Sequence, residues 1–538
     1  MRNYSSTITK NPVQTEPIPG KEMVKNNAGG YTFSVSALSR LDRFLILGAD
    51  SPTFYATQRD VLKDNVAALQ KLATELGPKM VDRIVEISDA GRAPSNDPAI
   101  FALVVAAKYG NDETRKAAYA ALPKVCRIGT HLYHFIKWAT DSKGWSRGMR
   151  TAVSKWFTEM PVEKLVYQLI KYQARDGVSS GYAINGAHML TERSRKFQSE
   201  TQKVALDWAV KGWDSVGSEP HPDKALAQIW AFERAKTANK AELLKLISQY
   251  RLPLECIPTE FKNDPDVWAA LLPGLGLEAV VRNLANMTRS GYVAPLSSGT
   301  KAILEKLGNP EIVKNSRFHP VSAIKALLTY ASGRGIRGTN TWTPVTAVST
   351  ALETLFYASF TAVEPTGKAF YKAVDVSGSM TGGQVANTPG FTPNMAAGVM
   401  SMVSARTEKV WHVAGFTDRL VTLNITPKMD LATICRELQR NNFGRTDCSQ
   451  PMLDALEKKM EVDVFEVFTD NETYAGSMHP SKALEKYRQK MGRDAKLIVY
   501  GMTSTGFTIA DPSDKNSLDV VGFDSAVPQV VNQFILGS

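Results

Sequence analysis

The sequence lacks the features of a membrane protein, of a disulfide-rich secreted protein and of a disordered protein. Its first 25 residues are polar, without the apolar core of a secretory signal, and no later run reaches the roughly 18 apolar residues of a membrane-spanning helix. Its four cysteines, Cys126, Cys256, Cys435 and Cys448, form no CxxC pair, so neither a disulfide framework nor a zinc knuckle is predicted. Low-complexity tracts are also missing. We therefore expect a folded protein of the cytoplasm.

Length and charge predict at least two domains with different partners. The 538 residues exceed the roughly 250 to 300 that one hydrophobic core organises. Residues 1–360 hold 46 Lys and Arg against 33 Asp and Glu, whereas residues 361–538 hold 18 against 20. A basic excess confined to the first part favours a polyanionic partner there, because a summed positive potential attracts phosphate backbones.

The segment from about residue 55 to residue 360 is predicted to be helical. Apolar residues at 62, 66, 69, 73 and 76 recur at steps of four and three, which places them on one helix face before Gly77 and Pro78 end the helix. Further helices are expected at 99–109, 112–122, 127–139, 146–159, 162–175, 201–213, 224–236, 240–249, 276–287, 320–332 and 343–360. So many amphipathic helices in series predict an α-solenoid of the HEAT type, with an irregular helical bundle as the alternative.

After residues 361–368 the pattern changes to alternating strands and helices. Short apolar strands are expected at 370–376, 410–416, 462–469 and 497–502, separated by helices at 394–406, 431–440, 450–460 and 480–491. This alternation predicts a doubly wound parallel sheet with helices on both faces. Ligands of such folds bind at the carboxyl ends of the strands.

A candidate metal site follows the first of these strands. Asp375, Ser377 and Ser379 stand at alternate positions on the loop that leaves the strand, so one carboxylate and two hydroxyl oxygens can aim at one point. Two later loops add Thr446 and Asp470. Hard oxygen ligands with few charges suit Mg²⁺ or another divalent cation. The alternative interpretation is a polar turn after a strand, which the positions of both partner loops argue against.

This pattern is similar to the metal-ion-dependent adhesion site (MIDAS) of von Willebrand A domains, which implies recognition through an open coordination position. Hydrolysis would need a general base or a second metal. The nearest candidates in the sequence are His412, expected to be a core histidine of its strand, and Asp447, expected to support the Thr446 loop. We therefore predict no catalytic residue. Arg445, beside Thr446, is expected to lower the cation affinity through its positive charge.

The sequence resembles the Ro autoantigen family, and in particular its bacterial-type members, over nearly its whole length. Members join a ring-shaped helical-repeat TROVE module to a von Willebrand A domain. The resemblance implies a ring-like HEAT-type solenoid at 1–362 and a doubly wound, Rossmann-like von Willebrand A domain at 363–538. It rests on blocks at 27–31, 40–48, 129–132, 144–147, 171–177, 446–449, 468–473 and 506–512.

The resemblance also implies a function. Such a protein binds small noncoding Y RNA on the outside of its ring and single-stranded ends of misfolded RNAs in the central hole. It acts in RNA quality control or as a tether for an exoribonuclease. It is expected to be a monomeric protein within a ribonucleoprotein and not an enzyme.

One candidate RNA-binding surface lies within residues 171–188. In a helix, Lys171 and Arg175 share a face that can span a phosphate backbone. His188 follows a Ser/Gly-rich loop and can stack on a base or bond a phosphate. The alternative for each basic residue is an ordinary solvated helix face. Relatives usually carry Trp, His and Arg at three positions that differ here, namely Val178, Ser180 and Asn185.

A second candidate cluster follows one face of a predicted helix and consists of Arg127, His131, His134 and Trp138. No third ligand stands near the two histidines, so zinc is not expected, and an RNA-facing stripe and a plain surface both stay open. The remaining candidates are Arg147 and Arg150 on the adjoining segment and Arg334 and Arg337 on a Gly-rich loop.

Two other classes of function stay open at this point. A metal-dependent RNA-processing nuclease would cleave RNA with Mg²⁺, and a protein-adhesion module would use the basic half only as a scaffold. RNA binding without catalysis is the favoured hypothesis, with cationic contacts from the helices and a metal-dependent protein or phosphate contact from the α/β domain.

Overall fold

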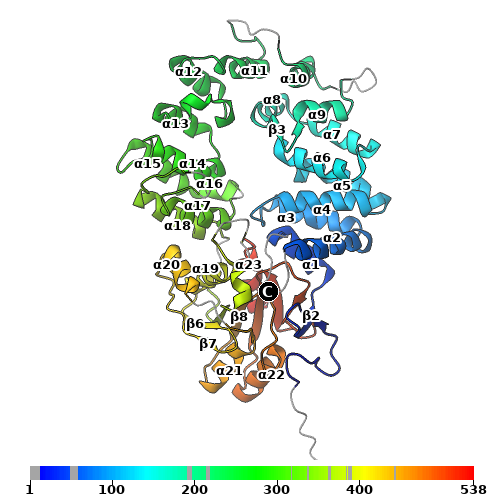
Figure 1. Ribbon diagram of the computed structural model, residues 1–538, viewed down its shortest axis with the longest axis vertical. Coiled ribbons are helices and arrows are strands. Elements are labelled where there is room, and N and C mark those ends of the chain that lie inside the picture. The colour runs from blue at the N-terminus through cyan, green and yellow to red at the C-terminus, as the bar shows by residue number, and fades with distance from the viewer. Residues whose placement is uncertain are drawn as a thin grey trace, which may run out of the picture. The chain divides into compact units, whose positions relative to one another are not determined.

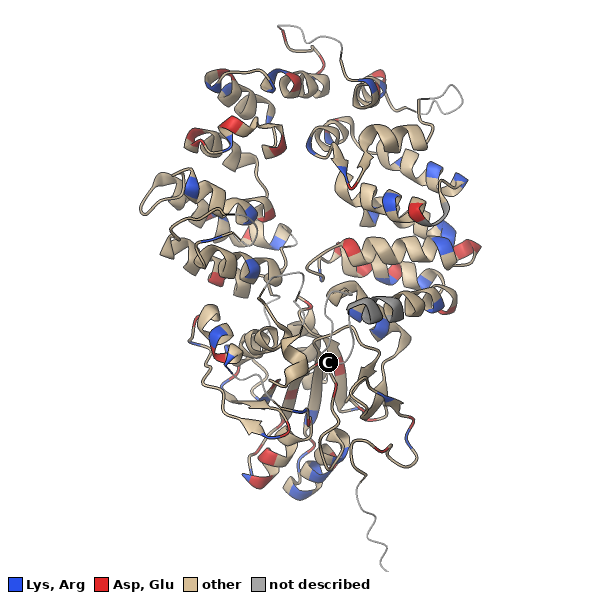
Figure 2. Cartoon of the chain, viewed as in Figure 1, with Lys and Arg blue, Asp and Glu red and all other residues tan. Residues whose placement is uncertain are grey.

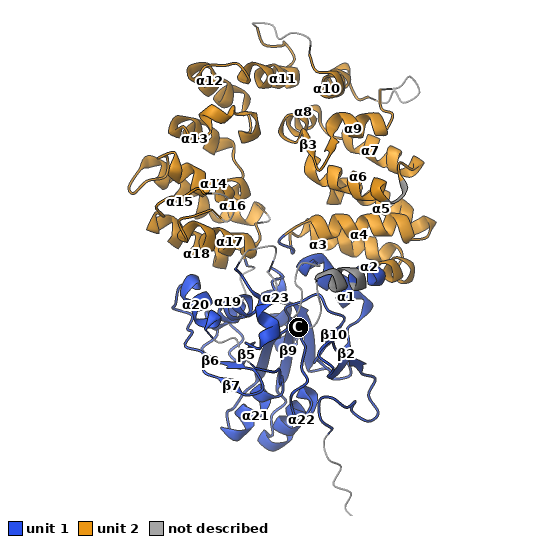
Figure 3. Ribbon diagram, in the orientation of Figure 1, with its two compact units in different colours: residues 1–68, 92–94, 360–538 blue, residues 69–91, 95–359 orange. Residues whose placement is uncertain are grey.

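The chain folds into two compact units, which Figure 3 colours separately. Unit 1 comprises residues 1–68, 92–94 and 360–538, and unit 2 comprises residues 69–91 and 95–359. The structure, a computed structural model, describes residues 12–48, 58–190, 197–213, 219–316, 318–335, 339–360, 365–382, 385, 390–440 and 444–537. Both ends of the chain therefore contribute to unit 1.

Unit 2 consists of helices that pack in chain order (Figure 1). Each packs mainly on helices one to three places away, as α3 does on α5, α4 on α6 and α17 on α18. This serial packing is typical of a solenoid. The helices, of which α2 crosses the division at residue 68, are α2 (Gln58–Glu75), α3 (Pro78–Asp89), α4 (Asp97–Tyr109), α5 (Asp112–Val125), α6 (Gly129–Lys143), α7 (Arg147–Thr158), α8 (Val162–Lys171), α9 (Ser180–Gly186), α10 (Glu200–Lys211), α11 (Lys224–Ala235), α12 (Lys240–Tyr250), α13 (Pro265–Leu271), α14 (Leu277–Arg289), α15 (Ser298–Leu307), α16 (Pro310–Asn315), α17 (Pro320–Ala331) and α18 (Thr346–Ala358), with short 3₁₀ turns η2 (Leu254–Cys256), η3 (Thr259–Phe261) and η4 (Leu272–Gly274).

Polar side chains cap the first turn of several of these helices. Asn111 caps α5 by accepting a hydrogen bond from the Thr114 backbone N–H at 2.8 Å. Ser146 caps α7 in the same way through the Met149 N–H at 3.1 Å. Figure 2 shows Lys and Arg interspersed with Asp and Glu along the helices of this unit. The basic excess of the first part of the chain is therefore spread over many helices.

One predicted helix is wrong in its last turn. Helix α8 ends at Lys171 and does not continue to residue 175, because the chain then forms a small antiparallel hairpin of β3 (Ala174–Arg175) and β4 (Val178–Ser179). At the turn, Asp176 and Gly177 have positive φ values of 50° and 80°. An Asp-Gly pair favours such a two-residue hairpin turn. Lys171 and Arg175 therefore do not share a helix face.

Unit 1 is built around a six-stranded sheet, in the order β11-β9-β8-β5-β6-β7 (Figure 1). All neighbouring strands are parallel except β6 and β7. The chain order reverses between β5 and β8, which is the switch point of a doubly wound sheet. The elements are β5 (Ala369–Asp375), η5 (Gly378–Thr381), α19 (Pro393–Ala405), β6 (Val410–Phe416), β7 (Leu420–Val421), α20 (Leu431–Gln439), α21 (Gln450–Glu457), β8 (Val464–Thr469), α22 (Pro480–Met491), β9 (Lys496–Gly501), β11 (Ser517–Val521) and α23 (Val527–Leu536).

The N-terminal residues belong to the same unit. Strands β1 (Val24–Lys25), β2 (Tyr31–Ser34) and β10 (Phe507–Thr508) form a three-stranded sheet, and α1 (Ala37–Leu47) packs against β11. Arg43 of α1 is fully buried and pairs with Asp519 of β11 at 2.6 Å. The compact units therefore differ from the linear boundary expected at residue 362, because segments from the two ends of the chain pack together.

The helical region followed by an α/β domain confirms the predicted fold class. All four cysteines are buried free thiols, as the absence of CxxC pairs predicts. Among the residues that the structure describes, no helix is both long enough and apolar enough to cross a membrane.

Candidate metal centre and candidate RNA-binding surface

The predicted metal site lies at the switch point of the sheet. β5 ends at Asp375 and β8 ends at Thr469, directly before Asp470. These strands are parallel neighbours, with Val374 opposite Phe468, so both aspartates stand at the same carboxyl edge. The fold therefore brings together two carboxylates that are 95 positions apart in the sequence.

The five predicted ligands are all buried, each at most 3% exposed, and several of their oxygens are held in place. Asp375 accepts a hydrogen bond from the Ser377 backbone N–H at 3.0 Å and another from the Thr469 hydroxyl at 2.6 Å. The Ser377 and Ser379 hydroxyl oxygens are 3.1 Å apart. By contrast, the Thr446 hydroxyl and the Oδ2 atom of Asp470 are buried without a hydrogen-bond partner. A bound cation would give these two buried oxygens the partner that they lack.

The electrostatics of the site also favour a positive ligand. Burial, together with the nearby Asp470 carboxylate, raises the pKa of Asp375 to about 7. Burial also raises the pKa of Asp470, although the Ser379 hydroxyl partly offsets this effect. A divalent cation between the two carboxylates would offset their repulsion and the cost of burying their charges. Among the residues that the structure describes, no group of three or more His, Cys, Asp or Glu residues is arranged to hold a metal ion, and the candidate site contains two aspartates with three hydroxyl groups.

The residues near the site support it and do not form a catalytic pair. Asp447 is buried and accepts hydrogen bonds from the Ser449 hydroxyl at 2.6 Å and from the Gln450 side chain at 2.7 Å, which holds the Thr446 loop as predicted. His412 stacks edge-on against Tyr371 at 4.7 Å and lies opposite it in the sheet. Because Tyr371 precedes Asp375 by four residues, the imidazole is on the order of 13 Å along the strand from the metal site.

Arg445, whose charge was expected to lower the cation affinity, forms an ion pair with another residue. Its side chain is 65% exposed and pairs with Asp418 at 3.3 Å. The neighbouring carboxylate and the solvent both reduce the positive potential that the guanidinium places on the site. We therefore expect Arg445 to lower the cation affinity less than its position beside Thr446 predicted.

The sequence alone did not predict that an N-terminal segment hydrogen-bonds the loop that follows Asp470 in the candidate metal site. Asn27 donates a hydrogen bond to Glu472 at 2.7 Å, and the Ala28 backbone N–H donates to the same carboxylate at 2.9 Å. The Asn26 side-chain amide donates to the Thr473 carbonyl at 2.8 Å. Glu472 is buried, and burial together with Asp470 raises its pKa to about 8. The N-terminal segment thus fixes the residues that directly follow a predicted ligand.

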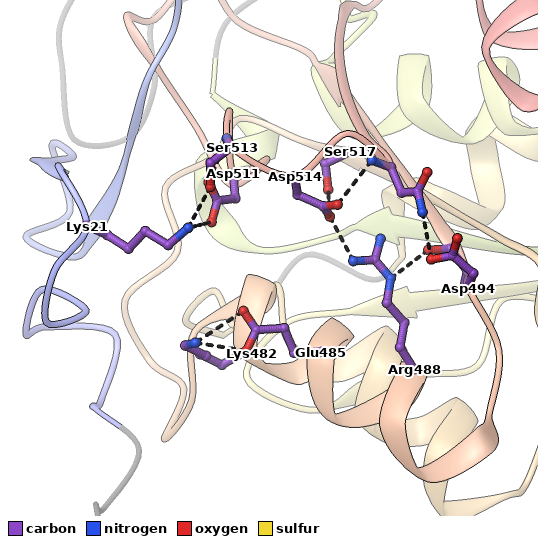
Figure 4. Close-up of polar contacts among 11 residues, drawn as sticks. Lys21, Lys482, Glu485, Arg488, Asp494, Asp511, Ser513, Asp514 and Ser517 are labelled. Carbon is purple, nitrogen blue, oxygen red and sulfur yellow. Dashed lines mark hydrogen bonds and ion pairs between the residues drawn. The ribbon is translucent and has the colours of Figure 1, made fainter. Parts of the chain in front are cut away.

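Close backbone packing and an outer ion pair complete this contact. A Cβ atom on Gly30 would lie 1.9 Å from the Thr473 carbonyl oxygen, so only glycine fits there. Further from the metal site, Lys21 pairs with Asp511 at 2.7 Å and donates to the Ser513 hydroxyl at 2.6 Å (Figure 4). The block at residues 27–31 was the available sequence signal, but nothing local indicated its partner.

Of the predicted RNA contacts, three residues lie on or near the hairpin of unit 2. Arg175 is exposed on β3, and His188 is exposed with a positive φ of 56°. The Lys171 ammonium lies over the rings of Tyr167 and Tyr172, 5.6 and 5.3 Å from their centroids. The hairpin therefore presents a guanidinium to solvent close to a lysine held on aromatic faces.

The second predicted cluster is largely built into the packing of the helices. Arg127 donates to the Ser88 hydroxyl at 2.9 Å and to the Lys124 carbonyl at 3.0 Å. His131 lies 3.3 Å from the Asn96 amide nitrogen, and burial lowers its pKa to about 4. These side chains already have protein partners, which favours the non-RNA alternative for both.

The other predicted positions have mixed surroundings. His134 is buried between two carboxylates, and Trp138 packs against it with ring centroids 5.3 Å apart. Arg150 donates to the Gly186 carbonyl at 3.1 Å, whereas Arg147 and Arg334 are exposed. Arg337 lies outside the described residues.

The domain models, the curated relatives and the solved structure that match this chain agree with one another. The TROVE domain model matches residues 24–329, and the Ro60 vWA domain model matches residues 370–535. The chain is 41% identical over 541 residues to the RNA-binding protein RO60 of Deinococcus radiodurans, with full coverage of both chains. It is 33% identical over 595 residues to the RNA-binding protein RO60 of Caenorhabditis elegans, covering 98% of this chain and 92% of that one. The crystal structure of the Deinococcus radiodurans RO (RSR) protein matches with a TM-score of 0.68 at 40% identity, covering 93% of this chain and all of that one.

Proposed function

Because this chain belongs to the Ro60 family, whose members join a TROVE domain to a von Willebrand A domain, we propose that it is an RNA-binding component of a ribonucleoprotein. Both curated relatives described above are named as RNA-binding proteins and not as enzymes. The observation that carries the proposal is the TROVE match over a helical unit in which an exposed hairpin presents Arg175. Binding without catalysis follows from this combination.

The proposed ligands are small noncoding Y RNA and single-stranded ends of misfolded RNAs. Lys171, Arg175 and His188 contact the Y RNA on the outside of the helical unit, and single-stranded ends enter its centre. The protein acts in the cytoplasm in RNA quality control or as a tether for an exoribonuclease. The exposed guanidinium of Arg175 on the hairpin supports the first of these contacts, because phosphate backbones bind Lys and Arg side chains.

This RNA contact is tested by joint substitution. The triple variant Lys171→Ala, Arg175→Ala, His188→Ala should bind a structured small RNA at least about tenfold more weakly, since each phosphate contact adds affinity that salt also removes. The matched control replaces Lys203, Lys211 and Arg282, three exposed cations of unit 2 that pair with acidic neighbours one turn away. Equal affinity of the triple variant and the control in gel-shift titrations would refute the assigned surface.

The metal site is proposed to hold Mg²⁺ through Asp375, Ser377, Ser379, Thr446 and Asp470. The two buried oxygens without partners support this assignment. A bound cation would offer a coordination position to an acidic group of a partner protein or to a phosphate. Asp375 and Asp470 would supply the negative charge that holds the ion, and the buried hydroxyl groups of Ser377, Ser379 and Thr446 would supply further oxygen ligands.

The two alternative functions have less support. A nuclease needs a general base beside the metal, and His412, which packs against Tyr371, is too far along the strand. A pure adhesion module leaves the hairpin cations without a role. Incubation of the purified chain with labelled RNA and Mg²⁺ should leave the RNA intact, and cleavage that Asp375→Ala abolishes would favour the nuclease.

A further inference from the structure

His134 occupies a position between two carboxylates that come from different elements of unit 2. Its Nδ1 atom lies 2.9 Å from Oδ1 of Asp97, in the first turn of α4. Its Nε2 atom lies 3.1 Å from Oδ2 of Asp176, at the turn of the β3–β4 hairpin. The ring is 8% exposed, and Nε2 is buried but not aligned for a regular hydrogen bond. A buried imidazole therefore joins a helix to the hairpin turn.

The number of protons on the ring decides how many carboxylates it can satisfy. The imidazolium cation carries an N–H at both ring nitrogens and can face both aspartates favourably. The neutral ring carries one N–H, so its other nitrogen presents a lone pair to a carboxylate. Asp97 makes the aligned hydrogen bond, which raises the pKa of His134. Loss of the proton therefore weakens the contact with Asp176 first.

The hairpin is short and packs against α6. Its two strands share two residue pairs, Ala174 with Ser179 and Arg175 with Val178. Its base is anchored by Tyr133 of α6, whose hydroxyl donates to the Tyr172 carbonyl at 2.6 Å. The contact between His134 and Asp176 holds the opposite end. Helix α6 thus contacts both ends of the hairpin, and its contact with the turn depends on a titratable ring, whereas buried Val178 and the Ser180 hydroxyl anchor the second strand and its end.

The Asp176 carboxylate also lies close to the RNA-binding cation. Its Oδ1 atom is 3.8 Å from Nε of Arg175. When His134 is charged, the carboxylate is shared between the imidazolium and the guanidinium. When His134 is neutral, the Asp176 carboxylate loses one of its positive neighbours, so it pairs more strongly with Arg175 and competes with an RNA phosphate for the guanidinium, while Lys137 of α6 also acts on this carboxylate.

We propose that His134 is a positioning residue for RNA binding, which in its protonated form holds Asp176 away from full pairing with Arg175 and so keeps the guanidinium available to RNA. The inference rests on the proposed function, in which Arg175 contacts RNA. It predicts that RNA affinity falls as pH rises through the titration of His134.

The charged and titratable groups around the ring support this assignment. They are Asp97 from α4, Asp176 and Arg175 from the hairpin, and His131 and Lys137 from α6, of which Lys137 is paired with Asp141 at 2.8 Å. His131 stays neutral above about pH 5, because burial lowers its pKa to about 4. Burial acts to raise the pKa of Asp97, but the His134 hydrogen bond and the nearby charges of His134, His131 and Arg175 together outweigh burial and lower this pKa. Because the Asp97 hydrogen bond raises the pKa of His134, its proton is lost above the ordinary range of an imidazole.

The test is a pH series of RNA affinity at fixed ionic strength. The probe is a fluorescently labelled RNA stem-loop with a single-stranded 3′ tail, bound to the full chain between pH 5.5 and 8.5. We expect the affinity of the unmodified chain to fall about fivefold or more over this range, the lower end of the coupling between linked sites. In Asp176→Asn and in His134→Gln this dependence should be largely lost. His221→Gln, which removes an exposed imidazole that makes no contact with the hairpin, should retain it.

A second measurement reports on the hairpin without RNA. Amide hydrogen exchange of residues 172–180, corrected for the intrinsic effect of pH, should lose protection as pH rises in the unmodified chain and stay constant in Asp176→Asn. Equal pH dependence of both affinity and protection in the unmodified chain, His134→Gln and Asp176→Asn would overturn the inference. Failure of the unmodified chain to bind RNA at every pH would instead contradict the proposed function itself.

Discussion

The Gln14 side-chain amide donates a hydrogen bond of 2.7 Å to the Asp447 carboxylate, across 433 positions of sequence. The same amide nitrogen donates to the Met478 carbonyl at 2.8 Å, and its carbonyl accepts from the Thr473 hydroxyl at 2.6 Å. One residue near the start of the chain therefore satisfies three groups on the loops around the proposed metal site. This relationship makes the N-terminal segment a structural part of that site.

The first prediction concerns this residue. Gln14→Leu keeps a similar volume but removes all three hydrogen bonds, so Asp447 and Thr473 lose a buried partner and the Thr446 loop loosens. We expect the Mg²⁺ affinity of the full chain, measured by isothermal titration calorimetry, to fall about tenfold, as for other residues that orient metal ligands.

The control for Gln14 lies on the same segment. Lys21→Met removes the ion pair with Asp511, which does not involve the metal-site loops (Figure 4). Its Mg²⁺ affinity should match that of the unmodified chain. Equal affinities for Gln14→Leu and the unmodified chain would show that the segment does not set the geometry of the ligands.

The second prediction concerns a proposed ligand directly. Thr446→Val replaces a buried hydroxyl that has no hydrogen-bond partner by a methyl group of similar size. Mg²⁺ affinity should fall by about tenfold or more. Because an unsatisfied polar atom is removed, stability without Mg²⁺ should be unchanged or higher. Thr503→Val removes another buried hydroxyl without a partner, outside the ligand set, and should leave Mg²⁺ affinity intact. A similar effect of both variants would argue against Thr446 as a ligand.

The third prediction concerns the attachment of α1 to the sheet. The Arg43 guanidinium is fully buried and donates to the Thr505 and Phe507 carbonyls at 2.9 and 2.8 Å, besides pairing with Asp519. Arg43→Met should destabilise unit 1 by about 3–5 kcal/mol, because it leaves a partly buried carboxylate and two carbonyls without their donor.

Differential scanning calorimetry of the full chain measures this loss as a lower transition temperature. The comparison variant is Arg282→Met, which breaks an exposed pair with Glu278 and should change stability by about 0.5 kcal/mol or less. If Arg43→Met melts together with the comparison variant, the buried pair does not hold α1 on the sheet.

The fourth prediction concerns the pH dependence of unit 2. The hydrogen bond with Asp97 raises the pKa of His134 above its usual value. Since the pKa is higher in the folded state, the stability that this pair contributes is complete below about pH 6.5 and is lost as pH rises through the folded-state pKa. Urea titrations of the unmodified chain should show this loss.

Asp97→Asn tests the cause of that loss. Without the carboxylate, the pKa of His134 should move down toward its ordinary value, which NMR titration of the imidazole measures. The decline in the free energy of unfolding between about pH 6.5 and 8.5 should shrink accordingly. A decline as steep as in the unmodified chain would assign the pH dependence to another group.

The sequence was sufficient to predict that Asp375 and Asp470 stand at the same edge of the sheet. Asp375, Ser377 and Ser379 lie on one loop, and a parallel sheet brings strand ends such as Asp470 to the same edge. The contacts of Gln14 could not be predicted in this way. No periodicity or spacing marks a pairing between residues 433 positions apart.

The hairpin at residues 174–179 is a different kind of error. The segment that ends in Arg175 is compatible with a continuing helix, and the helical pattern outweighed the turn signal. Asp176-Gly177, a strong signal for a tight hairpin, was present in the sequence and would have ended the helix earlier. The exposed position of Arg175 follows from that turn.

The contact of both chain ends within unit 1 also bears on synthesis. Gln14 leaves the ribosome 433 residues before its partner Asp447. At roughly 5–20 residues per second, that interval lasts roughly 20–90 s. During that interval the N-terminal segment lacks its hydrogen-bond partners, because the loops that supply them have not yet been translated. The contact between Gln14 and Asp447 therefore forms only after most of the chain has been translated.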